Sequence, residues 1–180
     1  MKLNNLEFAF DVFASEMAKL KNEKHFDYLI TIIGEDFGPE EGLGSIYIIE
    51  NTDSHERISV KMLAKKVGED YVIPTVCKIW KGAELLEREA YDFVGIRFLG
   101  NPDMRRLYLR NDFVGYPLRK DYDMSPENNK FPETDEPESD WTTEYNLDAD
   151  GNLIATKHRL FEEDDFVMNF GPNHPSTHGV

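Results

Sequence analysis

The spacing of apolar residues changes along the chain, and each change predicts a different element. Between residues 2 and 21 apolar side chains recur every three or four positions, which predicts an amphipathic helix with one core-facing stripe. Residues 25–33 are almost continuously apolar, as in a buried strand, and Gly34 ends that run. Two further strands are expected at residues 45–50 and 57–64, and the short polar connection between them predicts an antiparallel hairpin.

The middle of the chain predicts an edge strand, a second helix and a further strand. Residues 71–76 are mostly apolar, but Pro74 cannot donate a ladder hydrogen bond, so we expect this strand at the edge of a sheet. Residues 82–95 carry apolar side chains at helical spacing, and Gly95 is expected to end that helix in the left-handed conformation. Residues 105–109 then predict the next strand.

The polar positions of the second helix predict an exposed face. Glu84, Arg88 and Asp92 are spaced four residues apart, an arrangement that stabilises a solvated helix by roughly 0.2–0.5 kcal/mol per ion pair. Glu87 and Glu89 point to different sides of the helix, so they do not form a general acid/base pair. We therefore expect both to be solvated or to face a partner.

Together these elements predict an α/β domain of the α+β kind, in which a mixed, largely antiparallel sheet packs with two main helices. This domain is expected to span residues 1–122. Residues 123–165 follow as an extended acidic segment, within which residues 141–156 predict a β-hairpin with an Asp-Gly pair at its turn. Residues 166–180 change character again, to a polar and turn-rich sequence with two histidines.

Charge and cysteine content exclude two classes of function. The net charge is −15, and residues 121–165 hold 15 acidic against 3 basic residues, so the acidity belongs to this segment. No basic face with interleaved aromatics is present, which argues against nucleic-acid binding. Cys77 is the only cysteine, which fits a reducing compartment and excludes an iron–sulfur cluster bound by this chain, since such a cluster needs about four thiolates.

The hydropathy of the chain does not predict a membrane segment. No apolar run is long enough to span a bilayer, and the first residues lack the layout of a signal peptide. We therefore expect a soluble, cytosolic protein that reaches a membrane only through partners.

Residues 113–122, called here the docking segment, combine apolar and basic side chains without a helical or strand period, so they need a surface to lie on. One interpretation is a loop packed on its own domain. The other is a strap that docks on a partner, in which nearby cations meet the partner's carboxylates. These cations are Arg97, Arg105, Arg106, Arg119 and Lys120.

Three motifs, EREAYDFVGI, GNPDMRRLYL and GYPLRKDY, fill most of residues 87–122 and closely resemble the C subunit of respiratory NADH-quinone oxidoreductase, known as complex I. The likeness extends more weakly back through residues 26–86. Asn101 and Tyr116 stand where histidine is commoner in that family. The resemblance implies a mixed α/β fold and a role as a non-catalytic scaffold in the hydrophilic arm, peripheral on the cytoplasmic side of the bacterial inner membrane.

The last residues, GPNHPSTHGV, resemble the opening of the D subunit of the same complex, and in some bacteria the C and D subunits form one fused chain. The sequence would then be a C domain, its linker and the start of D, cut at Val180. In the family the second histidine of this pattern, here His178, lines the quinone headgroup pocket, a role that needs a complete D domain. A metal pair of His174 and His178 is disfavoured, because Pro175 and Gly179 oppose the helix that their spacing requires.

The resemblance also implies which residues contact partners, chiefly the D subunit and the cluster-bearing subunits. It assigns no catalytic residue and no metal ligand to this chain, and it places NADH, FMN, the iron–sulfur clusters and quinone in the assembled complex. Arg119 and Lys120 are the residues expected to form ion pairs with a partner. The full set of expected interface residues is Glu87, Arg88, Arg105, Arg106, Gly115, Pro117, Leu118, Arg119, Lys120, Asp121 and Tyr122.

Two alternatives stay open. One is the related subunit of a membrane-bound hydrogenase or ferredoxin-linked dehydrogenase, where the same domain serves another electron donor, although the His-Pro-Ser-Thr-His-Gly pattern favours the quinone enzyme. The other is a free acidic adaptor domain with no respiratory role. A calcium site that begins at residues 146–151 is disfavoured, because Lys157 stands where an EF-hand loop needs a glutamate.

Overall fold

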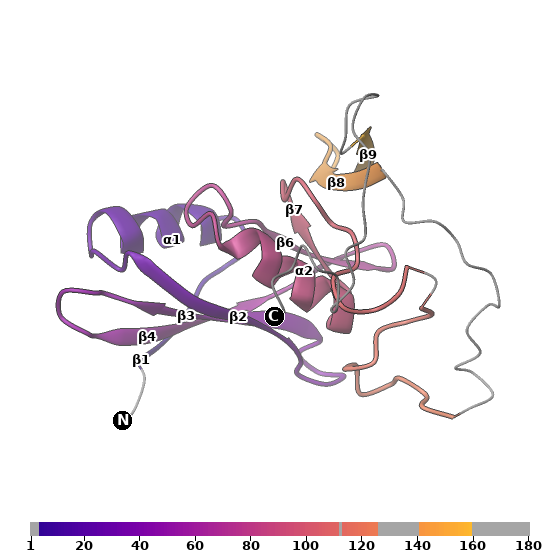
Figure 1. Cartoon of the computed structure of the whole chain (residues 1–180), viewed down its shortest axis with the longest axis horizontal. Coiled ribbons are helices and arrows are strands. Elements are labelled where there is room, and N and C mark those ends of the chain that lie inside the picture. Colours follow the sequence, from indigo (N-terminus) through magenta and orange to yellow (C-terminus); the bar gives the residue numbers. More distant parts are fainter. Residues whose placement is uncertain (1–3, 112, 126–140, 160–180) are drawn as a thin grey trace, which may run out of the picture.

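The computed structural model describes residues 4–111, 113–125 and 141–159, and Figure 1 shows α1 and α2 on one side of the first sheet. The mixed sheets and two helices confirm the α+β fold class predicted from the sequence. The elements are β1 (Asn4–Glu7), α1 (Phe13–Asn22), β2 (Tyr28–Asp36), β3 (Leu43–Glu50), β4 (Arg57–Leu63), β5 (Lys65–Val67), β6 (Asp70–Pro74), α2 (Ala83–Val94), β7 (Ile96–Leu99), β8 (Trp141–Leu147) and β9 (Leu153–Arg159).

The first sheet has the strand order β1-β4-β3-β2 and leaves β2 at one edge. Its centre is the antiparallel β3–β4 hairpin, in which Ile49 faces Ile58, so the predicted hairpin is confirmed. The helix predicted from residue 2 is wrong at its start, because Asn4–Glu7 form a strand parallel to β4 and α1 begins only at Phe13. Helical spacing of apolar residues cannot reveal this, since the pairing of β1 depends on β4, more than 50 residues away.

The second sheet has the order β5-β6-β7, and β6 is its central strand. The prediction of an edge strand here is wrong, because β5 pairs with β6 on one side and β7 pairs with it on the other. Pro74 is the last residue of β6, so its missing N–H lies at the strand's end and interrupts no ladder. The parallel pairing of β6 with β7 brings α2, the connection between them, against the first sheet.

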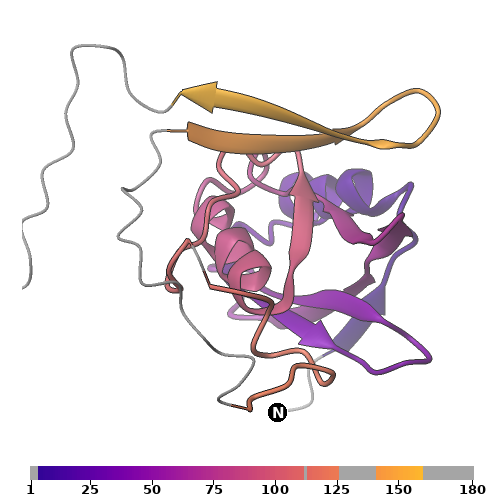
Figure 2. The same cartoon turned by 90° about the vertical axis from the view of Figure 1, so that its right-hand side faces the viewer.

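The third sheet is the predicted hairpin of β8 and β9, which is confirmed. Gly151 has a φ of 83° at its turn, and the Asp148 carboxylate accepts the amides of Asp150 and Asn152 at 2.9 and 2.8 Å. Figure 2 shows the hairpin lying across the domain. It is attached next to the end of β7, where the Gly100 amide donates to the carbonyl of Tyr145 at 2.8 Å.

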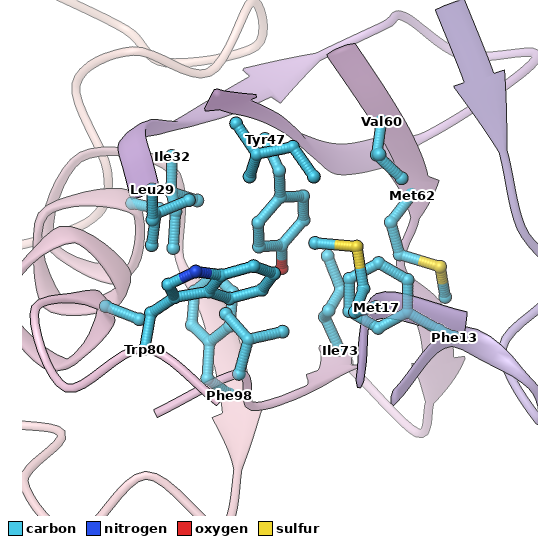
Figure 3. Close-up of a cluster of buried hydrophobic side chains, with 14 of the residues drawn as sticks. Phe13, Met17, Leu29, Ile32, Tyr47, Val60, Met62, Ile73, Trp80 and Phe98 are labelled. Carbon is cyan, nitrogen blue, oxygen red and sulfur yellow. The ribbon is translucent and has the colours of Figure 1, made fainter. Parts of the chain in front are cut away.

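The core lies between the first sheet and the elements that cover it. Figure 3 shows Tyr47 in the middle of the cluster, with Phe13 and Met17 of α1 on one side and Trp80 and Phe98 on the other. The rings of Phe13 and Tyr47 are 5.1 Å apart, and the indole of Trp80 donates a 3.0 Å hydrogen bond to a backbone carbonyl. In the described residues no helix is both long and apolar enough to cross a membrane.

Helix α2 lies directly on β2. A Cβ built on Gly34 would come within 2.9 Å of the Cβ of Ala90, so no side chain fits between the strand and the helix at this point. Glycine on one element and alanine on the other thus bring the two backbones into close contact. This contact fixes where the remaining faces of α2 point.

Candidate functional site

The polar face of α2 is buried, and the prediction that it is solvated is wrong. Glu87 and Asp92 are 0% exposed and Arg88 is 9% exposed. The chain that follows β7, residues 100–111, folds back over this face and supplies partners for its charges. Burying charge is costly unless it is paired and hydrogen-bonded. Arg88 and Asp92 meet both conditions, and Glu87 is hydrogen-bonded to neutral donors. Glu87 therefore has no exposed surface that a partner could contact.

Glu87 fixes two loops at once. Its Oε1 accepts the backbone amide of Val76 at 2.8 Å, and its Oε2 accepts the Thr75 hydroxyl at 2.7 Å and the Asn101 side-chain amide at 2.8 Å. The thiol of Cys77 also donates to Oε2 at 3.2 Å. Burial raises the pKa of Glu87, while these hydrogen bonds oppose the rise. The same burial, together with the charge of Glu87, raises the pKa of the Cys77 thiol, which is therefore a poor nucleophile.

Asp103 joins α2 to the β8–β9 hairpin. Arg88 reaches its Oδ2 at 3.0 Å, Arg105 donates to its Oδ1 at 2.9 Å, and the buried hydroxyl of Thr142 donates to Oδ1 at 2.7 Å. Burial on its own would raise the pKa of Asp103, but the bonds from Arg105 and Thr142 and the charge of Arg88 bring it down to about 2. Asp103 is thus ionised throughout the physiological range and holds three parts of the chain together.

Asp92 organises the chain after Arg106. Its Oδ2 accepts the consecutive amides of Leu107, Tyr108 and Leu109 at 3.1, 2.7 and 2.9 Å, and its Oδ1 accepts from Arg106 at 3.0 Å. Three amides that turn toward one oxygen cannot also form a sheet ladder. The strand predicted at residues 105–109 is therefore wrong, and this segment is a loop wrapped around a carboxylate.

The docking segment lies on its own domain. The Leu118 amide donates to the carbonyl of Phe93 at 3.0 Å, the Arg119 Nε donates to the carbonyl of Val94 at 2.6 Å, and the Lys120 amide donates to Asp36 at 2.8 Å. Of the two interpretations of this segment, the structure shows the loop packed on its own surface.

Gly95 makes this packing possible. It ends α2 with a φ of 81°, as predicted, and a Cβ at this position would come within 2.5 Å of the Arg119 guanidinium and 2.6 Å of the Tyr116 ring. The Arg119 guanidinium lies over that ring, 4.5 Å from its centre, and Tyr91 packs edge-on against it at 6.0 Å. The glycine therefore serves the helix end and the docking segment together.

Most of the cations expected to meet a partner already have contacts within this chain. Arg97 pairs with Asp70, Arg105 with Asp103 and Arg106 with Asp92, in addition to the contacts of Arg119. Among the other expected interface residues, Arg88 is buried, Gly115, Pro117 and Tyr122 are half-buried, and Leu118, Lys120 and Asp121 are exposed.

The structure does not bring together a metal site within the described residues. No group of three or more histidine, cysteine, aspartate or glutamate side chains there is arranged to hold a metal ion. Asp148, which the calcium hypothesis used, instead caps its own hairpin turn. His174 and His178 lie outside the described residues, and their roles stay predictions.

The polar network includes residues that were not predicted from the sequence, among them Thr75, Cys77, Asp103 and Thr142. The Gly-Asn-Pro-Asp turn was a signal for part of it, because Asn and Asp side chains commonly bond their own turn, and Asn101 Oδ1 does accept the Asp103 amide at 2.9 Å. Thr142 gave no comparable signal, since its contact joins residues 39 positions apart.

Comparison with known proteins gives a family match. Residues 8–128 match the family model described as respiratory-chain NADH dehydrogenase, 30 Kd subunit. The NADH-quinone oxidoreductase C/D subunit of Phocaeicola vulgatus is 49% identical over 165 residues, which are 92% of this chain and 31% of that protein. The NADH-quinone oxidoreductase C subunit of Chloroherpeton thalassium is 46% identical over 98 residues, which are 54% of this chain and 40% of that protein. The chain thus spans about a third of the length of the C/D relatives it matches.

Two solved structures share the fold of this chain. A chain of the membrane-bound sulfane sulfur reductase, an archaeal respiratory membrane complex, is 28% identical with a TM-score of 0.60, covering 76% of this chain and 85% of that one. The trypsin-resistant fragment of Nqo5 is 30% identical with a TM-score of 0.50, covering 55% of this chain and 80% of that one.

Proposed function

The chain belongs to the respiratory-chain NADH dehydrogenase, 30 Kd subunit family, and from this premise we propose that it is the C part of an NADH-quinone oxidoreductase. In this role it is a scaffold that carries no redox centre and helps to assemble the quinone-reducing module. Its partners are the D subunit, fused to the C subunit in the relatives named C/D, and the cluster-bearing subunits. It acts on the cytoplasmic side of the membrane, in the peripheral arm.

The observation that carries the scaffold role is the internal use of the charges on α2. Glu87, Arg88 and Asp92 each bond several groups of the same chain, and together they hold residues 101–109 against α2. Buried and fully bonded networks of this kind rigidify the surface above them. A surface that is rigid before assembly loses little conformational entropy on binding, which favours a protein whose task is to hold others.

The cofactors of the assembled enzyme belong to other parts of it in this proposal. NADH, FMN and the iron–sulfur clusters bind elsewhere in the complex, and the quinone binds in a complete D domain. There His178 donates a hydrogen bond or a proton to the quinone carbonyl, which an imidazole can do near neutral pH. A His178→Ala enzyme is expected to lose quinone reductase activity while its NADH oxidation with an artificial acceptor persists, and unchanged quinone reduction would contradict this role.

Affinity purification of the native protein from detergent-solubilised membranes tests the proposed function. Mass spectrometry of the recovered material is expected to show NADH-oxidising and cluster-bearing subunits together with a chain much longer than 180 residues. Recovery of the protein alone, as a short species, would refute the respiratory role and favour an adaptor.

A second candidate function rests on the structural likeness to the archaeal sulfane sulfur reductase. It is the equivalent scaffold of a membrane-bound complex with another electron donor or acceptor, such as a hydrogenase or a ferredoxin-linked dehydrogenase. The curated relatives named quinone oxidoreductase, at up to 49% identity, favour the first candidate. The same purification separates the two, because hydrogenase or ferredoxin-linked subunits would replace the NADH-oxidising ones among the recovered proteins.

A further inference from the structure

A groove of about 130 Å³ lies where the edge strand β2 meets α2 and the docking segment. We call it the β2–α2 groove. Its floor includes Gly34 and Ala90, whose close contact brings strand and helix together. Its complete lining is Thr31, Ile32, Ile33, Gly34, Glu89, Ala90, Phe93, Val94 and Leu118.

Two of the apolar side chains that line this groove are exposed. Ile33 is 44% exposed and Leu118, in the docking segment, is 61% exposed. The ring of Phe93 stacks on that of Tyr108 at 5.6 Å, and Tyr108 is itself 66% exposed, so apolar surface continues beyond the groove. Clustered exposed apolar side chains beside a concavity are typical of surfaces that bind another protein.

One charged group lines the groove, and it is an acid. Glu89 is half-buried there, and within the described residues its carboxylate takes part in no hydrogen bond or ion pair. The other acids of α2 behave differently, since Glu87 and Asp92 are saturated with donors from this chain. A half-buried carboxylate without a cation in its own chain can pair with a lysine or arginine that a partner supplies.

We propose that the β2–α2 groove receives a neighbouring protein of the assembly through an aliphatic side chain next to a lysine or arginine, which pairs with Glu89. The charges in this contact are the reverse of those expected from the sequence, in which cations in and near the docking segment meet carboxylates of the partner. The reason is that the Arg106 and Arg119 guanidinium groups bond groups of this chain, whereas the Leu118 side chain is exposed and the Glu89 carboxylate has no cation partner among the described residues. This inference rests on the proposed scaffold function and specifies the surface through which it acts.

Four variants of the full-length protein, each expressed in cells and purified from solubilised membranes, test the proposal. Leu118→Asp and Glu89→Lys change the groove, and Leu85→Asp and Glu84→Lys make the same changes on α2 outside its lining. Leu85 is 55% exposed, close to the value for Leu118, so it is a matched control. Each groove variant is expected to lower recovery of partner subunits at least ~5-fold, which corresponds to a loss of about 1 kcal/mol of binding free energy. The control variants are expected to leave recovery unchanged.

The possible outcomes distinguish a failure of the groove proposal from a failure of the proposed scaffold function. If the wild-type protein recovers respiratory subunits and both groove variants recover them equally well, the groove proposal is overturned and the scaffold function stands. If the control variants lose partners as strongly as the groove variants, the effect is not local to the groove and the proposal is also overturned. If the wild-type protein recovers no partner at all, the proposed function itself is wrong.

A photo-crosslinking residue in place of Leu118 identifies the occupant directly. The expected product joins this position to a peptide of another protein of the complex that contains a lysine or arginine next to an aliphatic residue. A second protein carrying Glu89→Lys with the same crosslinker is expected to lose that product. A crosslink to another copy of this chain, or an unchanged product in the Glu89→Lys protein, would contradict the proposed contact.

Discussion

Replacing Asp92 by asparagine tests whether one carboxylate holds residues 107–109 in place. Asparagine has the same shape but keeps a single acceptor oxygen, and its amide group places N–H donors where an acceptor is needed. In the native protein Oδ2 accepts three backbone amides and Oδ1 accepts from Arg106. Either orientation of the new amide therefore leaves buried donors facing each other.

The expected loss can be worked out from these bonds. Removing one member of a buried ion pair costs about 3–5 kcal/mol, because the other charge stays buried without a partner. Arg106 keeps its bonds to the carbonyls of Phe113 and Gly115, which limits that penalty. We therefore expect Asp92→Asn to lower the free energy of unfolding by roughly 3 kcal/mol, a large share of the ~5–15 kcal/mol typical of a domain.

Urea denaturation followed by tryptophan fluorescence measures this loss, since Trp80 is buried in the core. Amide hydrogen exchange adds a local readout, in which Leu107, Tyr108 and Leu109 should lose protection together. Asp121→Asn, an exposed acid in the docking segment, is the control and should change stability by less than about 0.5 kcal/mol. An Asp92→Asn protein that stays within about 1 kcal/mol of wild type, with normal protection of those amides, would refute the reasoning.

Three further predictions concern other parts of the network. The pKa of Asp103 is lowered from 3.8 to about 2, so its ionised form stabilises the fold by on the order of 2 kcal/mol above about pH 4. This stabilisation is lost as the pH falls through 2, and in acid urea titrations Asp103→Asn should show a smaller loss of stability with falling pH than the wild type. Gly95→Ala should cost about 1–2 kcal/mol from the φ of 81° alone, plus displacement of Tyr116, and a normal thermal midpoint would contradict this. Thr142→Val should cost about 1 kcal/mol and speed amide exchange at Gly100, which unchanged exchange would disprove.

Elements that depend on neighbours in sequence could be predicted from the sequence. The β3–β4 hairpin, the β8–β9 hairpin and α2 each have their period and their turn residues within one short stretch. Gly95 is an example, because a glycine after the last apolar position of a helix is enough to predict its left-handed end. The position of β6 within its sheet was not predictable in this way, since it depends on β7, which follows only after α2.

The polar network could not be predicted, for a physical reason. Helical spacing shows that Arg88 and Asp92 share a face, but it does not show whether that face meets water or protein. What buries it is the return of residues 100–111, and that return is itself held by Asp92. The burial of the polar face of α2 and the path of residues 100–111 depend on each other, so no local sequence pattern predicts either one. The family motifs identified this stretch as important without revealing that Glu87, Arg88, Asp92 and Asp103 are buried.

The contact of Gly34 with Ala90 has a mechanical consequence. Because no side chain separates the strand from the helix at this point, we expect β2 and α2 to move together as one unit. These two elements line the β2–α2 groove and also carry the Asp92 carboxylate. A partner bound in the groove is therefore expected to change the hydrogen-exchange rates of the amides at residues 107–109, although these amides do not line the groove.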